Sequence, residues 1–522
     1  MKKFGEIMCG KNILSILDRL VEERKNDVSH TYCTDDFRDK KVYYISSGGD
    51  DSNDGLTEKS PWKTIDKINS MGNALNGSVI RFRCNDVFRG NVTLQNGITY
   101  TSFGSGNKPI IIGSPENGAD ESKWILVDKE KSIWKYLTLL KDVGTVVFNG
   151  GESFATKLTP EIIEKNINGE IFYEYNRTYN DLNDLQFICV FDAKRALNDK
   201  EFKKSCGELY LRCDRGNPGN IYNSVEFNTY GYIFDGSNYY DGCNTDITID
   251  NLKLLYTGGH GIGCSSAENL TVQNCEIGWI GGAVMTYYKN EKDKIFYRAG
   301  RYGNGVEVTG FCNGYTVKNC YIHDIYDAGV THQNGRTNYT QQREYKNVCY
   351  TENLIERCCY SVEYFAHDSS DGKHSVIMKN IEISNNIMRC SGMGLCEQRV
   401  SENFIGDSCD GKLGFNLGSH INGWYNAENN AVNFVIKNNI FDRTIPNEGK
   451  RRPSGLIIIS SQKEECLPEM SGNTYINYYG KNFAYFGVNT DMFVWNAQTD
   501  ENTEEFVLNI LKDKNGKVFF AD

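Results

Sequence analysis

The chain has 522 residues and a formal net charge of −11 at neutral pH, which argues against nucleic-acid and anionic-membrane partners. Its 51 glycines, 8 prolines, 32 tyrosines and 26 phenylalanines suit tight-turned β structure rich in aromatic side chains. No apolar stretch approaches the roughly 18 residues that a membrane-spanning helix requires.

Residues 1–40 start with a short basic segment but lack the uninterrupted apolar run of a secretion signal, so we expect a cytoplasmic protein. Apolar residues then recur at helical spacing at Ile13, Ile16, Leu17 and Leu20. This pattern predicts a short amphipathic helix, and we expect it to cap the first turn of the fold that follows.

The next segment, residues 41–62, predicts a strand at Val42–Ser46, a polar loop and a turn that begins at Pro61. We expect Trp62 to plug the end of the core, and stacking on a sugar is the alternative. Residues 116–228 then break the pattern of the surrounding chain with short strands of their own, which predicts a β-rich inserted subdomain.

One short phrase recurs after residue 250: an apolar–Asn–apolar step followed by a Gly-apolar strand, as in NLTVQNCEIGWIGGAV and NIEISNNIMRCSGMGL. Its anchors, Cys275, Cys320, Leu354 and Ile387, lie 45, 34 and 33 residues apart, as rungs with loop insertions would. A β unit of this size cannot bury its apolar face alone, so copies stack into a solenoid.

The repeats therefore predict an all-β chain, a right-handed parallel β-helix over residues 41–477 with a cap at 478–522. Val272, Val317 and Ile383 precede equivalent Asn turns and should point into one shared core. We also expect the turn Asn side chains to bond from rung to rung.

Most of the 18 cysteines occupy strand-like apolar positions, for example Cys275, Cys320, Cys358 and Cys390. Without a secretion signal, they are better interpreted as reduced, buried small hydrophobes than as disulfides. No Cys/His spacing indicates zinc.

Long polar inserts interrupt the rungs at similar phases, at Lys289–Asn304, Gln333–Lys346, Ala366–His374 and Arg399–Gly423. We expect them to cluster on one side of the solenoid, because loops that rise from one face build binding sites.

Carboxylates beside these inserts are the main chemical signal. Glu307, Asp327, Glu363 and Glu397 each lie in or next to the Gly-apolar strand of a rung. Carboxylates on adjacent rungs would be about 5 Å apart and those two rungs apart about 10 Å. These separations bracket the two geometries of glycoside hydrolysis, which needs a pair of carboxyl groups.

Five of the seven histidines fall in the same region, at His323, His332, His367, His374 and His420. Near carboxylates they suit hydrogen bonding to sugar hydroxyls or tuning of a carboxyl pKa. A metal site built on His323 and Asp327, or on His367 and Asp368, remains an alternative without a decisive spacing, and no metal or cofactor is predicted.

Three motifs add a family resemblance: DAGVTHQ at 327–333, SVEYF at 361–365 and GMGxxEQR at 392–399, followed by His420. They resemble the β-helix glycosidases grouped near glycoside hydrolase family 141, and residues 41–62 resemble the opening of many carbohydrate-active β-helix proteins.

The resemblance implies action on plant-wall glycans, with Asp327 as one catalytic carboxylate and Glu363 or Asp368 as its partner. The residues expected to bind substrate are Glu307, His332, Gln333, His367, Glu397, Arg399, His420 and Trp424.

The leading prediction is a glycoside hydrolase that acts on an oligosaccharide or plant-type polysaccharide. One alternative is a polysaccharide lyase or epimerase, in which Arg399 or Arg336 would serve as base and Ca²⁺ would neutralise a uronate. Another is a non-catalytic glycan-binding solenoid, since the fold alone does not establish an enzymatic activity.

Overall fold

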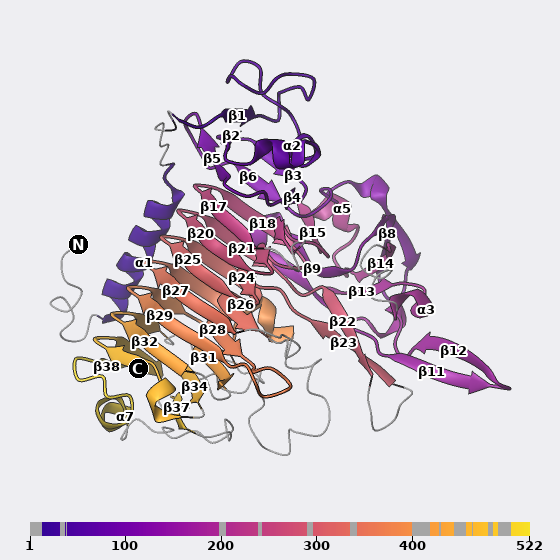
Figure 1. Cartoon of the computed structure of the whole chain (residues 1–522). Helices are drawn as coiled ribbons and strands as arrows, with labels where there is room; N and C mark the ends of the chain where they lie inside the picture. The colour runs from indigo at the N-terminus through magenta and orange to yellow at the C-terminus, as the bar shows by residue number, and fades with distance from the viewer. Residues whose placement is uncertain are drawn as a thin grey trace.

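The computed structural model describes residues 13–31, 37, 39–197, 205–237, 243–289, 296–334, 342–398, 418–426, 430–442, 456–461, 463–478, 484–488 and 503–521. Its main body is a parallel β-helix whose rungs stack along one axis, with an inserted subdomain at its side (Figure 1). The predicted fold class is therefore confirmed.

The rungs build three faces of parallel strands. Face one contains β1 (Val42–Ile45), β2 (Val79–Arg83), β5 (Thr99–Phe103), β17 (Asn244–Asp250), β20 (Ala267–Gln273), β25 (Cys312–Lys318), β27 (Arg343–Thr351), β29 (Val376–Ser384), β32 (Asn430–Lys437) and β35 (Glu469–Ser471). Face two contains β3 (Val87–Arg89), β6 (Ile110–Ile112), β18 (Lys253–Thr257), β21 (Glu276–Ile280), the first halves of β26 (Tyr321–Asn334) and β28 (Leu354–Ala366), β30 (Ile387–Arg389), β33 (Ile440–Asp442), β36 (Thr474–Tyr478) and β38 (Lys517–Ala521). Face three contains β4 (Val92–Thr93), β16 (Phe234–Gly236), β19 (Ile262–Cys264), β24 (Val306–Thr309), the second halves of β26 and β28, β31 (Ser419–Asn426), β34 (Ile457–Ser461) and β37 (Ala484–Val488).

Residues with positive φ recur every five positions in a rung and bend the chain. In one rung they are Asn269, Asn274 and Trp279, with φ of 55°, 51° and 57°. Asn adopts this left-handed region at lower cost than other non-Gly residues, because its short polar side chain bonds locally. This backbone requirement explains why the repeated phrase keeps an Asn at its turn.

A second set of asparagines lies inside the solenoid and forms the predicted ladder. Asn353 Nδ2 donates to Asn386 Oδ1 (3.0 Å), and the same contact links Asn386 to Asn439 and Asn439 to Asn473. The ladder ends on Asp513, whose carboxylate accepts from the backbone and side-chain nitrogens of Asn473 (3.0 Å each). Asp513 thus takes the place of the next rung's Asn.

The apolar core follows the stack. Val272 pairs with Val317, Val317 with Tyr350 and Tyr350 with Ile383, and all four side chains are buried. This in-register column confirms the shared core predicted for Val272, Val317 and Ile383. Trp62 is 1% exposed and stacks on Tyr43, which agrees with its expected place in the core.

Helix α1 (Ile13–Ser29) forms where the apolar spacing predicts it, but its position differs from the expected one. Its buried residues Ile13, Leu17 and Val21 pack on outward residues of face two: Leu354, Ile387, Ile440 and Ile476. The helix therefore runs along the side of the solenoid over later rungs and does not cap the first one (Figure 1). The outward aliphatic residues of these rungs require such a cover.

The segment between β6 and β16 projects from the corner between faces two and three (Figure 1). Its seven-stranded sheet consists of β7 (Trp124–Asp128), β8 (Ile133–Leu140), β9 (Val143–Phe148), β10 (Ser153–Lys157), β13 (Gln186–Val190), β14 (Gly207–Arg212) and β15 (Val225–Thr229). A second sheet joins β11 (Ile162–Ile167) and β12 (Glu170–Tyr175) to a hairpin of the solenoid, β22 (Val284–Lys289) and β23 (Phe296–Arg301). The segment has an apolar core of its own, to which that hairpin contributes Val284 and Ala299.

The remaining helices are short: α2 (Ile65–Met71), α3 (Ala193–Ala196), α5 (Pro218–Ile221) and α7 (Thr503–Asn509). No helix in the described ranges is long and apolar enough to span a membrane. The cysteines in these ranges are free thiols, and most are buried.

Candidate active site

Face three carries an outward column of polar residues that we name the carboxylate column. In strand order it consists of Thr93, Asp235, Gly263, Glu307, Thr331, Glu363 and Asn422. Alternation along each strand fixes its direction: Val306 and Val308, on either side of Glu307, belong to the solenoid core. Glu307 and Glu363 are in register with Thr331 from opposite sides, so they lie two strands, or about 10 Å, apart.

Glu307 is 6% exposed and is held by several donors. Asn304 Nδ2 donates to its Oε2 (2.6 Å), and Thr309 Oγ1 donates to its Oε1. Burial alone would raise its pKa, but the charge and hydrogen bond of His260 and the bonds from Thr309 and Asn304 lower the pKa to about 2. Glu307 is therefore a carboxylate at neutral pH.

His260 lies between two partners. Its Nδ1 is 2.9 Å from Glu307 Oε2 and 3.0 Å from the backbone nitrogen of Asn304. One ring nitrogen cannot accept the Asn304 N–H and donate to Glu307 at the same time, so the proton position selects between the two contacts. Thr309 and Asn304 donate to Glu307 in either case.

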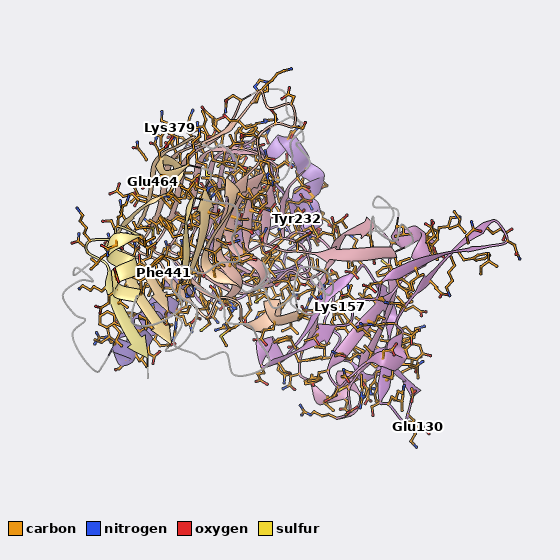
Figure 2. All side chains as sticks on the ribbon, turned by 90° about the horizontal axis from the view of Figure 1, so that it is seen from below. Glu130, Lys157, Tyr232, Lys379, Phe441 and Glu464 are labelled. Carbon is orange, nitrogen blue, oxygen red and sulfur yellow. The ribbon has the colours of Figure 1, made fainter. Side chains whose placement is uncertain are left out.

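Tyr232 closes the column on the side toward the N-terminus. Its ring lies over Gly263, where an added Cβ would approach the ring to 3.0 Å, and meets the His260 ring edge-on at 4.7 Å. In Figure 2, Tyr232 lies on the side of the solenoid that faces the inserted subdomain, and Glu130 marks the far part of that subdomain.

Asp327 is 5% exposed and lies at the corner between faces two and three, just before the second half of β26. Its N–H donates to Gly303 O, and the strand register shifts between Ile325 and Ala328. Glu363 pairs with Thr331, four residues farther along β26, or about 13 Å of extended chain. Asp327 and Glu363 are thus on adjacent rungs but are not opposite each other.

Asp368 lies at the other end of the strand, beyond β28. Its Oδ1 accepts the backbone N–H of Val376 (3.1 Å), which anchors the start of β29. His367 is half-buried next to it, with its ring 5.8 Å from that of Phe365. Asp327 and Asp368 therefore lie at opposite ends of the outer face, and the structure does not bring them together.

Two predicted substrate-binding histidines, His332 and His420, are buried. His332 is fully buried among tyrosines; its Nδ1 is 2.9 Å from the Tyr350 hydroxyl, and burial lowers its pKa to about 3. His420 is 1% exposed, with its two nitrogens bonded to Ser391 Oγ and Asp442 O. Period-2 alternation turns His332 inward, whereas His420 has the same strand parity as the outward Asn422 and is buried by its contacts with Ser391 and Asp442. Neither side chain is exposed for the expected contact with substrate.

Gln333, another predicted substrate-binding residue, points outward, two residues beyond Thr331. Glu397 is exposed, and its carboxylate accepts the N–H of Gly394 at the start of the short helix η6 (Gly394–Gln398). Arg399 and the side chain of Trp424 lie outside the described part of the chain.

Next to Glu397, the buried Gln398 connects the solenoid to the inserted subdomain. Its Oε1 accepts from the backbone nitrogen of Lys157 and from Arg301 Nη2 (3.0 Å each). Lys157 also pairs with the buried Asp142, and Figure 2 shows Lys157 where the two parts meet. This network holds η6 against the corner that precedes face three.

The four inserts do not share one side. Lys289–Asn304 and Arg399–Gly423 leave from the corner between faces two and three, whereas Gln333–Lys346 and Ala366–His374 join the end of face three to face one. Their points of attachment therefore lie at both edges of face three, which differs from the expected one-sided cluster. Residues 290–295, 335–341 and 399–417 of these inserts lie outside the described part of the chain. The inserts occur at two positions in the rung because each face is joined to the next by a corner, and a loop can lengthen at either corner.

Within the described ranges, no three His, Cys, Asp or Glu side chains are grouped so that they could hold a metal ion. His323 belongs to face two, where it contacts Asp324 (2.8 Å) and Glu276 (3.5 Å), and Asp327 is not among its contacts. The alternative metal site on His323 and Asp327 is thus not formed.

Sequence reasoning missed His260, Asn304 and Thr309. Their signal was local: Gly259-His260-Gly261 comes just before a strand, at the same phase as Gly303-Asn304-Gly305 one rung later. Only strand register shows that both corners converge on Glu307.

No model of a known protein family and no curated protein matches the sequence. Among solved structures, the chain is similar to one titled glycoside hydrolase (TM-score 0.44, 9% identity, covering 86% of this chain and 95% of that one). It is also similar to XylC in complex with xylose (TM-score 0.41, 11% identity, 85% and 69%) and to the GH136 lacto-N-biosidase from Eubacterium ramulus (TM-score 0.37, 12% identity, 97% and 70%). Because each TM-score is below 0.5, the fold assignment rests on the strand register and not on these likenesses.

Proposed function

We propose that the chain is a glycoside hydrolase that cleaves an oligosaccharide or plant-type polysaccharide with carboxylates of face three. The observation that carries the proposal is the register of Glu307, Thr331 and Glu363 in one outward column. Two strand spacings separate the acids by about 10 Å, near the upper end of the separation of inverting enzymes, about 6.5–9.5 Å, and wider than the roughly 5 Å of retaining ones. This supports inversion, with water between the base and the sugar.

The two acids differ in the roles they suit. Glu307 is ionised at neutral pH because His260, Thr309 and Asn304 stabilise its charge, so it activates the water. Glu363 is the proton donor to the glycosidic oxygen. Asp327, which the family resemblance favours as a catalytic acid, is the alternative partner of Glu363 from the corner of the neighbouring rung.

The test is turnover on a panel of nitrophenyl glycosides and plant-wall oligosaccharides. Glu363→Gln and Glu307→Gln should each lower kcat about 10²-fold or more, the usual scale for loss of a general acid or base. Glu268→Gln, an exposed carboxylate on face one, is the matched control and should keep wild-type turnover. NMR of the first-formed product should show the inverted anomer.

Three outcomes would change the proposal. If Asp327→Asn abolishes turnover while Glu307→Gln does not, the catalytic pair is Asp327 and Glu363. Formation of an unsaturated sugar that stops on addition of EDTA would indicate the lyase alternative. Binding without turnover on any substrate, unaffected by all three substitutions, would indicate a glycan-binding solenoid.

A further inference from the structure

One residue of the carboxylate column has a buried side chain without a partner. Asn422 is 0% exposed, and neither its amide oxygen nor its amide nitrogen has a hydrogen-bond partner among the described residues. Leaving a buried amide unpaired is unfavourable, so such a group indicates a missing polar neighbour. Asn422 is in register with Glu363, about 4.8 Å away across the sheet.

A second outward column runs beside the first, two residues farther along the strands. It consists of Thr309, Gln333 and Phe365, which pair in register. Thr331 Oγ1 donates to Gln333 Oε1 (3.3 Å), which orients the amide; its Nε2 has no acceptor among the described residues. Gln333 therefore presents N–H donors beside Glu363.

Phe365 adds an apolar surface to this group. Tyr364 before it points into the core, so the Phe365 ring faces outward, half-buried, with His367 against it. The apolar faces of sugar rings pack on aromatic rings, whereas their hydroxyl groups need donors and acceptors at the ring edge. Phe365, Gln333 and Asn422 surround Glu363 with these groups.

We infer that Asn422, Gln333 and Phe365 form a subsite for an uncharged sugar ring next to Glu363. This inference rests on the proposed function and adds a substrate class. Asn422 and Gln333 bond hydroxyl groups without contributing charge, and Phe365 supports the ring. The ionised Glu307 two strands away repels a uronate, so a neutral glycan fits this subsite and an anionic one does not.

The test measures binding by calorimetry with full-length Glu363→Gln protein, which keeps the subsite but slows turnover. The probes are xylohexaose, cellohexaose and mannohexaose as neutral chains and hexagalacturonate as the anionic chain. At least one neutral probe should bind, and hexagalacturonate should bind at least tenfold more weakly. Adding Asn422→Leu or Phe365→Ala should weaken the neutral probe about tenfold, the loss of one hydrogen bond or ring contact.

A matched control separates binding from stability. Thr145 in the inserted subdomain also buries an unpartnered polar atom, so both Thr145→Val and Asn422→Leu should raise the urea midpoint, but only Asn422→Leu should weaken binding. Equal affinity for hexagalacturonate, no binding of any neutral probe, or unchanged affinity in Asn422→Leu and Phe365→Ala would each overturn the subsite. Wild-type turnover in Glu363→Gln would instead overturn the catalytic proposal alone.

Discussion

Faces two and three of the solenoid both bury carboxylates on their outer sides, but the side chains that stabilise the negative charges differ. On face two, Asp324 receives two bonds from Arg357 (2.9 Å each), and Asp442 receives one from Arg389 (2.7 Å). On face three, the contacts of Glu307 come from the neutral Asn304 and Thr309 and from His260.

The comparison separates two uses of a buried acid. A carboxylate matched by arginine serves the packing of the face, here the face that α1 covers through Lys25–Glu356 (3.2 Å) and Asp18–Arg389 (3.4 Å). Glu307 has no arginine partner among the described residues, and its charge is stabilised by His260, Thr309 and Asn304. We expect such a carboxylate to act on a ligand. Mutation of an acid with a shifted pKa should therefore affect mainly turnover on face three and mainly stability on face two.

The largest expected effect is on face three. Glu307→Gln should lower kcat about 10²-fold or more. The free energy of unfolding should also fall, by about 1–3 kcal/mol, because the new amide nitrogen faces a donor from Asn304 or Thr309, but the protein should stay folded under assay conditions. Turnover and urea denaturation are measured on the same preparation. A loss of stability without loss of kcat would place Glu307 with the structural acids of face two.

The reverse is expected on face two. Arg357→Ala removes both bonds to the buried Asp324 and should lower the free energy of unfolding by about 2 kcal/mol, the scale of a hydrogen bond to a charged group. Because Arg357 lies away from the carboxylate column, kcat at low temperature should stay at the wild-type value. A 10²-fold fall in kcat with intact folding would contradict the division between the faces.

Acid should weaken face two as well as the contacts of Glu307, whose pKa is also lowered to about 2. The pKa of Asp324 is lowered to about 2: burial alone would raise it, but His323 and Arg357 outweigh that. An unfolded Asp has a pKa near 4, so the contribution is complete above about pH 4 and is lost as the pH falls toward 2. Its size is about 2 kcal/mol.

His323 acts in the opposite direction. Burial alone would lower its pKa, but Asp324 and Glu276 raise it, so its contribution is present below about pH 6.5 and is lost as the pH rises through the folded value. Urea denaturation from pH 2 to 8 measures both. In Asp324→Asn the free energy of unfolding should fall less steeply between about pH 4 and pH 2 than in the wild type. An unchanged pH dependence in this range would show that Asp324 does not contribute to it.

The smallest effect is expected at the end of the Asn ladder. Asp513→Asn replaces one accepting oxygen with an amide nitrogen that faces donors from Asn473 or Gly472. The free energy of unfolding should fall by about 1 kcal/mol. A similar loss in kcat would be unexpected, since this cap is on an interior ladder and not on face three.

The sequence by itself determined the solenoid. Asn at many turns, alternating apolar residues and the recurring phrase required stacked rungs, and the column of Val272, Val317 and Ile383 formed as predicted. These features are local, because the left-handed turn and the period of two depend on a few neighbouring residues.

Only the tertiary structure decided which polar residues meet. His332 lies one residue beyond Thr331, yet a single step along a strand turns its side chain from the outer face into the core. His260 and Glu307 are 47 residues apart in sequence and touch because their rungs stack in register. Which residues pair between rungs depends on the length of every insert and on contacts between distant parts of the chain. No single sequence motif contains that information.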